Sequence, residues 1–177
     1  MSVRQEAESA LVVPVPMAES VVGSWRTRLD PACRLGIPAH VTLVYPFVPP
    51  GQIDGALIDE LDAVFSGVSG FDYELSGVRW FGADVVWAEP KPAEPFMQLI
   101  DLVLAEWPQF PPYEGEFDEV VPHLTIAQNC PRRDMEAAAE AVAAELPIPA
   151  RADRVWLMAG SQEIDSWEVQ AEFPLRS

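Results

Sequence analysis

Residues 38–43 read Pro-Ala-His-Val-Thr-Leu, and residues 121–126 read Val-Pro-His-Leu-Thr-Ile. These stretches hold the only two histidines of the chain, His40 and His123, and each stands two residues before a threonine. Because the chain has only three threonines, a chance pairing of both histidines with threonine at the same offset is improbable. The repeated motif predicts that the two stretches contribute equivalent halves of one catalytic cleft.

Both motifs have the alternation of a half-buried strand. Successive side chains of a strand point to opposite faces, so each histidine shares a face with the threonine two residues later, and the apolar residues between them face the other way. We therefore expect His40, Thr42, His123 and Thr125 to face a common cleft. The apolar neighbours of both motifs should face the core.

This residue set suits the opening of a phosphodiester. The reaction needs a base for the attacking water or hydroxyl and an acid for the leaving oxygen, and histidine, with a reference pKa of about 6.5, serves in either role. Threonine hydroxyls can donate to the non-bridging oxygens as their charge grows. The sequence predicts His40 and His123 as catalytic, Thr42 and Thr125 as phosphate-binding, and requires neither a metal nor a cofactor.

Length and composition predict one domain. The chain has 177 residues and 49% hydrophobic content, enough for one sizeable core shared by two lobes. Its longest apolar stretch, residues 11–22, is broken by Pro14, Pro16 and Glu19, which fits neither a membrane span nor a secretory signal. We expect a cytoplasmic protein, with Cys33 and Cys130 as reduced thiols.

The net charge restricts the partners. A formal charge of −17 repels long polyanions, so duplex nucleic acid is disfavoured, while a few local donors can still hold one or two phosphates. We expect a small phosphodiester or nucleotide substrate, or a short RNA end, with no membrane partner, and a monomer.

Hydrophobic periodicity gives the order of elements. Strands are expected at 10–16, 40–47, 71–75, 121–127, 154–158 and 167–173, with a short hairpin at 80–87. Helices are expected at 17–29, 53–65, 96–107 and 135–146, the last one capped by Asp134. The order strand, helix, histidine strand, helix thus occurs twice. It predicts a single domain over 1–177 with two pseudo-two-fold lobes, repeat units 9–66 and 70–147, and closing strands within 150–175.

The chain resembles the two-histidine (2H) phosphoesterase superfamily, in its 2′-5′ RNA ligase-like or cyclic phosphodiesterase branch. Residues 36–47, Gly-Ile-Pro-Ala-His-Val-Thr-Leu-Val-Tyr-Pro-Phe, and residues 121–127 carry the resemblance. It implies a bilobal α+β fold with antiparallel sheets flanking a central cleft. It also implies metal-independent hydrolysis of a 2′,3′-cyclic or 2′-5′-linked phosphodiester, with His40 and His123 as the acid and base and with Thr42 and Thr125 binding phosphate.

One position departs from that resemblance. Many relatives place a basic residue shortly after the second motif, where this chain has Gln128. The missing cation argues against RNA-end binding and ligation more than against hydrolysis of a small molecule. Arg132 and Arg133 would compensate if the following helix turned them toward the cleft.

Other interpretations remain open at this point. Two histidines and an acid can bind zinc or iron, although helical His-x-x-x-His spacing and a facial-triad acid are missing. A non-catalytic module could hold a nucleotide or RNA end in the same cleft, because phosphate recognition does not require turnover. Aromatic residues are candidates for stacking on a base, with core packing as the alternative: Tyr45, Phe47, Trp80, Phe81 and Trp156.

Overall fold

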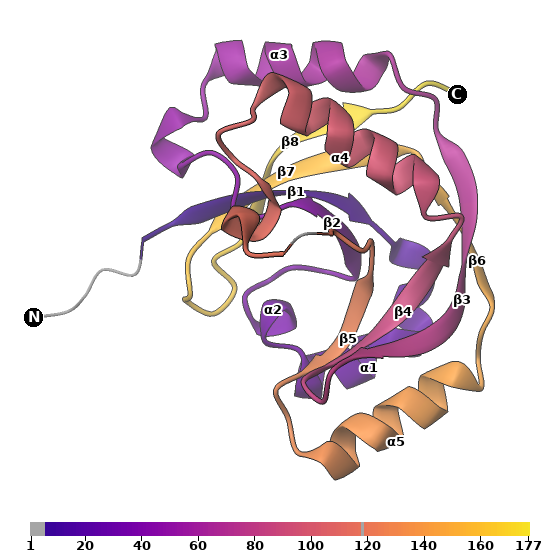
Figure 1. Ribbon diagram of the computed structural model, residues 1–177. Coiled ribbons are helices and arrows are strands. Elements are labelled where there is room, and N and C mark those ends of the chain that lie inside the picture. The colour runs from indigo at the N-terminus through magenta and orange to yellow at the C-terminus, as the bar shows by residue number, and fades with distance from the viewer. Residues whose placement is uncertain (1–5, 118) are drawn as a thin grey trace, which may run out of the picture.

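The fold is a pair of four-stranded antiparallel sheets with helices packed around them (Figure 1). The computed structural model describes residues 6–117 and 119–177. In the first sheet the strand order is β2 (His40–Val44), β1 (Glu8–Pro14), β7 (Arg154–Gly160) and β8 (Glu168–Pro174). In the second sheet it is β5 (Leu124–Gln128), β4 (Val85–Lys91), β3 (Phe71–Phe81) and β6 (Ile148–Ala152).

The two sheets place equivalent strands at equivalent positions. Each motif strand, β2 or β5, lies at one edge of its sheet and pairs antiparallel with β1 or β4. Because β2 and β5 also contact each other, the two motifs meet where the lobes join. The structure confirms the predicted α+β class with two antiparallel sheets, whereas the exact repeat boundaries stay a prediction.

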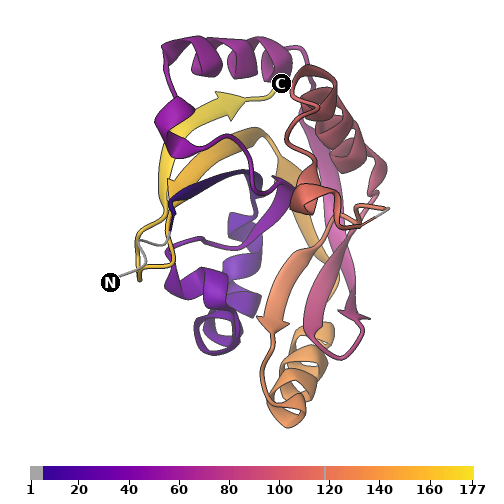
Figure 2. The same ribbon diagram turned by 60° about the vertical axis from the view of Figure 1, so that its left-hand side comes forward.

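The helices link the lobes reciprocally. The helices are α1 (Glu19–Leu29), α2 (Pro31–Arg34), α3 (Gly55–Ser66), α4 (Glu94–Glu106) and α5 (Arg132–Ala143), with 3₁₀ turns η1 (Pro16–Ala18), η2 (Pro50–Gln52) and η3 (Pro112–Gly115). Helix α1, which precedes the first motif in the chain, packs on β5 of the second motif, and α4, which precedes the second motif, packs on β2 of the first. In both views α3 and α4 lie at one end of the molecule and α5 at the other (Figures 1 and 2).

One hydrophobic cluster extends through both lobes. It includes Val41 and Leu43 from β2 and Leu124 and Ile126 from β5, each at most 1% exposed. These residues alternate with the half-buried His40, Thr42 and Thr125. Burial of each apolar side chain stabilises the fold by roughly 1.5–3 kcal/mol, so the core fixes the register that turns the polar residues the other way.

The expected short hairpin at 80–87 is wrong in extent. The separate strand expected at 71–75 continues as β3 to Phe81, and β4 runs from Val85 to Lys91. The pairing of β3 with β4 shifts between Leu75 and Gly77. A bulge of this kind interrupts the two-residue alternation, so one long strand resembles two short segments in the sequence.

Residues 148–152 form a strand that the sequence did not predict as a separate element. This strand, β6, contains Pro149 and lies at the edge of the second sheet, where proline is tolerated. Only Asp153 separates β6 from β7, although the two strands belong to different sheets. The chain therefore ends with three strands instead of the two that were expected.

The expected N-cap at Asp134 is also wrong. Helix α5 begins at Arg132, with Pro131 in the capping position and Asp134 in the first turn. An acidic side chain in a first turn is favoured by the helix dipole, so a cap and a first-turn acid leave similar sequence signals. The short α2, capped by Asp30, was not expected from the sequence.

Candidate functional site

The four predicted site residues line one cleft of about 740 Å³. His40 is the first residue of β2, and Thr42 follows on the same strand. Thr125 lies on β5, whereas His123 precedes that strand by one residue. The residue before His123 is Pro122, which has no backbone N–H to donate to a partner strand. Because β2 and β5 contact each other, side chains from both motifs line the same space between the lobes.

The two imidazole rings are held in the same way. Nδ1 of His40 lies 2.7 Å from the carbonyl oxygen of Pro38, and Nδ1 of His123 lies 2.7 Å from that of Val121. A carbonyl oxygen can only accept, so Nδ1 carries the proton in both rings. In the neutral ring Nε2 then remains as a free base, and in the charged ring it becomes an acid.

Burial controls the charge of His40. It lowers the pKa of His40 to about 4, and the positive charge of Arg26 acts in the same direction. The hydrogen bond to Pro38 opposes this effect. In the free protein His40 is therefore neutral at pH 7, with Nε2 available to accept a proton.

His123 lies against aromatic side chains. The rings of Phe81 and Trp87 stack at a centroid distance of 4.5 Å, and the His123 ring stands nearly perpendicular to Phe81 at 5.1 Å. Burial lowers the pKa of His123, while the hydrogen bond to Val121 and the negative charge of Asp30 oppose that effect. The two histidines thus share a local geometry but have neighbours of opposite charge.

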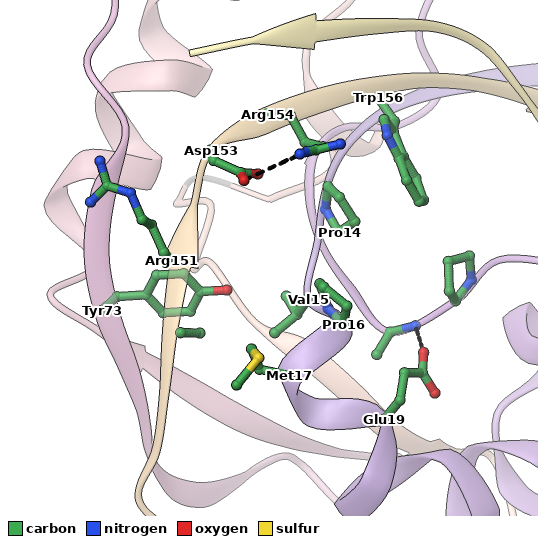
Figure 3. A pocket seen from close by; sticks show the side chains of 13 residues that line it. Pro14, Val15, Pro16, Met17, Glu19, Tyr73, Arg151, Asp153, Arg154 and Trp156 are labelled. Carbon is green, nitrogen blue, oxygen red and sulfur yellow. Dashed lines mark hydrogen bonds and ion pairs between the residues drawn. The ribbon is translucent and has the colours of Figure 1, made fainter. Parts of the chain in front are cut away.

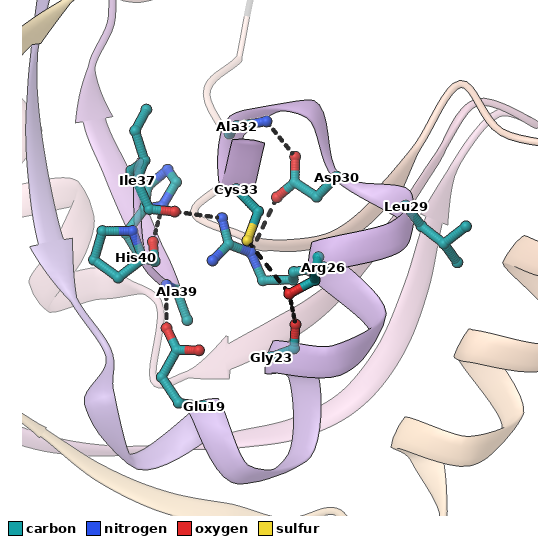
Figure 4. A network of polar contacts seen from close by, with 12 residues as sticks. Glu19, Gly23, Arg26, Leu29, Asp30, Ala32, Cys33, Ile37, Ala39 and His40 are labelled. Carbon is teal, nitrogen blue, oxygen red and sulfur yellow. Dashed lines mark hydrogen bonds and ion pairs between the residues drawn. The ribbon is translucent and has the colours of Figure 1, made fainter. Parts of the chain in front are cut away.

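A buried ion pair that the sequence reasoning missed lies beside this cleft (Figure 4). Nε of Arg26 lies 3.0 Å from Oδ2 of Asp30, and both side chains are 1% exposed. Arg26 belongs to the buried stripe of α1 with Val22 and Leu29. The helical spacing of these residues, and the four-residue offset to Asp30, was the signal available in the sequence.

No lysine or arginine is among the described residues that line the cleft. Arg132 instead pairs with Glu136 and lies 4.7 Å above the Trp80 ring, and Arg79 pairs with Glu89 on the surface. Arg133 is exposed and lies outside the cleft lining. The compensation considered for Arg132 and Arg133 is therefore wrong, because α5 turns them away. The charged and amide side chains of the lining are Asp30, Asp84, Glu119, Gln128 and Gln162.

The aromatic candidates separate into two groups. Tyr45 and Phe81 line the cleft. Phe47 is buried against Trp107, and the guanidinium of Arg132 lies over the ring of Trp80. Three further aromatic residues of the lining were not among the candidates: Tyr113, Phe117 and Trp167.

Trp156 lies at a second, smaller cavity of about 480 Å³ (Figure 3). This cavity is bordered by Pro16, Tyr73 and two arginines, Arg151 and Arg154, which pair with Asp72 and Asp153. None of the four predicted site residues lines it. Trp156 therefore lines this second cavity and not the cleft, although it packs against a cluster that includes Ala10, Val12 and Trp167 of the cleft lining.

Three further findings apply to residues 6–117 and 119–177. No group of three or more His, Cys, Asp or Glu side chains there is arranged to hold a metal ion. Cys33 and Cys130 are free thiols. No helix in this part of the chain combines the length and apolar character needed to cross a membrane.

Comparisons with known proteins agree with the fold. The family model of the 2′-5′ RNA ligase superfamily matches residues 13–163. E. coli LigT, solved with 3′-AMP, is 17% identical; the match covers 98% of this chain and 100% of that one, with a TM-score of 0.63. LigT solved with NADP⁺ is 17% identical; the match covers 98% of this chain and 99% of that one, with a TM-score of 0.60. TT0787 of Thermus thermophilus is 18% identical; the match covers 96% of this chain and 98% of that one, with a TM-score of 0.60. No curated protein matches the chain significantly.

Proposed function

Because the chain belongs to the 2′-5′ RNA ligase superfamily, we propose that it is a metal-independent phosphodiesterase that uses His40 and His123 as its acid and base. The family supports a phosphoesterase activity of the 2H type. The proposal that His40 and His123 are the acid and base rests on one observation. Both Nδ1–H groups hydrogen-bond to backbone carbonyls, while both rings line one cleft. This arrangement leaves two Nε2 atoms for proton transfer.

Thr42 and Thr125 are proposed to bind the phosphate. Each threonine stands two residues from its histidine, a separation of roughly 6.5–7 Å along an extended backbone. An imidazole and a hydroxyl at that spacing can reach neighbouring oxygens of one phosphate. The hydroxyls would donate to non-bridging oxygens, whose negative charge increases in the transition state.

The charge of the cleft favours a small, singly charged phosphodiester. Its described lining holds three carboxylates and no arginine or lysine, so each additional phosphate meets repulsion without a compensating cation. A 2′,3′-cyclic nucleotide or a 2′-5′-linked dinucleotide carries one negative charge per diester. Phe81 and the exposed Phe117 offer aromatic surface for a base. The complexes of LigT with 3′-AMP, NADP⁺ and ATP support a nucleotide as the ligand. The preference for a singly charged diester rests on the charge of the lining alone.

The first experiment is a turnover assay. Chelator-treated protein is incubated with 2′,3′-cyclic nucleotides and 2′-5′-linked dinucleotides, and the products are separated by chromatography. The His40→Ala/His123→Ala variant is the control. Turnover by the parent alone is the expected result. Ligand binding without turnover would overturn the proposal and favour a non-catalytic nucleotide-binding or RNA-end-binding module.

A further inference from the structure

The second cavity, next to Trp156, is lined by residues of both sheets (Figure 3). Its volume of about 480 Å³ falls within the range of small-molecule sites. The first sheet contributes Pro14 of β1 and Trp156 of β7. The second sheet contributes Tyr73 of β3 and Ala150 of β6. The cavity shares no lining residue with the cleft that holds the two histidines, so a molecule bound here would contact both lobes without entering the cleft.

Tyr73 places a buried hydroxyl in this cavity. The residue is 5% exposed, and its ring packs edge-on against Phe96 in the core, with the ring centroids 4.9 Å apart. The hydroxyl extends beyond the ring toward Val15 and Pro16 (Figure 3). It has no hydrogen-bond partner within residues 6–117 and 119–177, although buried hydroxyls in folded proteins are nearly always paired. Because a phenylalanine ring would fill the same place in the core, packing alone does not account for the hydroxyl.

Trp156 brings a second donor to the same lining. Its indole packs against the cluster that includes Val12 and Met158, and Nε1 is buried without a partner in the described part of the chain. An indole N–H can only donate. Burial raises the pKa of Tyr73, so its hydroxyl keeps the proton at neutral pH and can donate as well. Two uncharged donors therefore favour a ligand that carries a hydrogen-bond acceptor, such as a carbonyl oxygen.

The charged side chains of the lining already have partners. Nη1 of Arg151 lies 2.9 Å from Oδ1 of Asp72, and Nε of Arg154 lies 2.9 Å from Oδ1 of Asp153. Oε1 of Glu19 accepts a backbone N–H at 2.6 Å. A charged ligand would lose hydration on entering the cavity, and each ion that could balance its charge is already paired. The lining thus suits an uncharged molecule.

The rest of the lining is mainly apolar. Three prolines, Pro14, Pro16 and Pro38, border the cavity together with the rings of Tyr73 and Trp156. Such rings offer surface on which a planar ring can pack. The lining also includes a methionine at position 17 that is 60% exposed, so the cavity can be reached from solvent.

We propose that this cavity binds a small, uncharged, planar ring molecule whose acceptor oxygen receives a hydrogen bond from the Tyr73 hydroxyl. Trp156 supplies the second donor, and the prolines pack on the ring. Because the cavity is separate from the cleft, this site does not depend on the proposed function. The ligand would also contact Pro38, whose carbonyl oxygen lies 2.7 Å from Nδ1 of His40.

Benzamide is the probe, because it combines a planar ring and a carbonyl group with no charge. It is titrated into the ¹⁵N-labelled full chain, and the backbone amide signals are followed by NMR. Saturable shifts centred on Ala39 and Ala150 are expected, with a Kd in the roughly millimolar range of so small a ligand. Shifts centred on Thr42 and Thr125 would place benzamide in the cleft and overturn the proposal. The proposal would also fail if no shift were saturable, since the cavity would then hold water only.

Tyr73→Phe tests the hydrogen bond. The variant keeps the ring against Phe96 and removes one hydroxyl, so it should bind benzamide about two- to tenfold more weakly than the parent. Tyr45→Phe is the matched control, because Tyr45 lines the cleft, and it should leave the affinity unchanged. Equal affinity of the parent and Tyr73→Phe, or an equal loss in Tyr45→Phe, would overturn the proposal.

Ala150→Met tests the location by filling the cavity. Ala150 is the partner of Tyr73 across β3 and β6, so both side chains lie on the same face of the sheet. The longer side chain should abolish the saturable shifts, while thermal unfolding checks that the fold persists. Undiminished binding by the folded variant would place benzamide elsewhere and overturn the proposal. If this variant does not fold, Tyr73→Phe still decides the question.

Two further probes test the chemistry of the ligand. Benzoate has nearly the same shape as benzamide but carries a charge, and toluene has the ring without the acceptor. Both should bind the parent at least threefold more weakly than benzamide. Tighter binding of benzoate would overturn an uncharged ligand, and tighter binding of toluene would overturn the role of the two donors. None of these measurements requires turnover, so they remain decisive if the proposed function fails.

Discussion

The carbonyl oxygen of Pro38 lies 2.7 Å from Nδ1 of His40, two residues later in the chain. Val121 and His123 repeat this relationship at the same distance. Each histidine is therefore oriented by its own motif, and both rings keep Nε2 free. Activity, ligand affinity and stability should all depend on this shared geometry and on the unequal surroundings of the two rings.

Replacing either histidine by alanine is expected to lower kcat by about 10²- to 10⁴-fold, the range for a lost general acid or base. The fold should persist, because both rings are only partly buried and hydrogen-bond to their own backbone segment. Steady-state kinetics and thermal unfolding measure the two effects. Full turnover by His40→Ala or His123→Ala would contradict the catalytic role.

Thr42→Val and Thr125→Val are expected to reduce kcat/KM by about 10- to 100-fold each, because a hydrogen bond to a charged group contributes roughly 1.5–3 kcal/mol. Valine keeps the shape and suits a strand. Thr27→Val is the matched control, since Thr27 is exposed on α1 and donates to its own helix at Gly23. Equal rates for all three variants would remove the threonines from the site.

Gln128→Arg is expected to strengthen binding of adenosine 3′-monophosphate several-fold at neutral pH. The new cation would stand on the cleft lining, near three carboxylates and a doubly charged phosphate. Gln170→Arg adds the same charge at an exposed position of β8, outside the cleft. Calorimetry measures both affinities. An equal gain in the control would indicate only a change in net charge.

Acidification is expected to destabilise the protein through His40. Burial lowers its pKa from 6.5 to about 4, so the unfolded chain binds more protons between these values, and the free energy of unfolding rises with pH in that window. At about pH 4.5 the loss relative to neutral pH amounts to about 2 kcal/mol. Urea unfolding compares the parent with His40→Gln at both pH values. An equal loss of unfolding free energy in the parent and in His40→Gln would contradict a contribution from His40.

Much of the fold could be predicted because it depends on local patterns. Apolar periodicity located α1, α3 and α4, and the alternation of His-Val-Thr-Leu and His-Leu-Thr-Ile located the inner and outer faces of both motifs. The errors arose where a long-range interaction overrides a local pattern. The bulge in β3 breaks the alternation, and β6 accepts Pro149 because it is an edge strand.

The sequence alone determined the pairing of two histidines with two threonines and the face that each motif turns away from the core. These features depend on the two-residue period of a strand and on apolar burial. Only the tertiary structure decided that both motifs line one cleft, that Arg132 and Arg133 lie outside it, and that Arg26 and Asp30 lie beside the histidines. Those outcomes depend on how the lobes pack, because residues distant in sequence acquire their fields and hydrogen-bond partners only when the lobes meet.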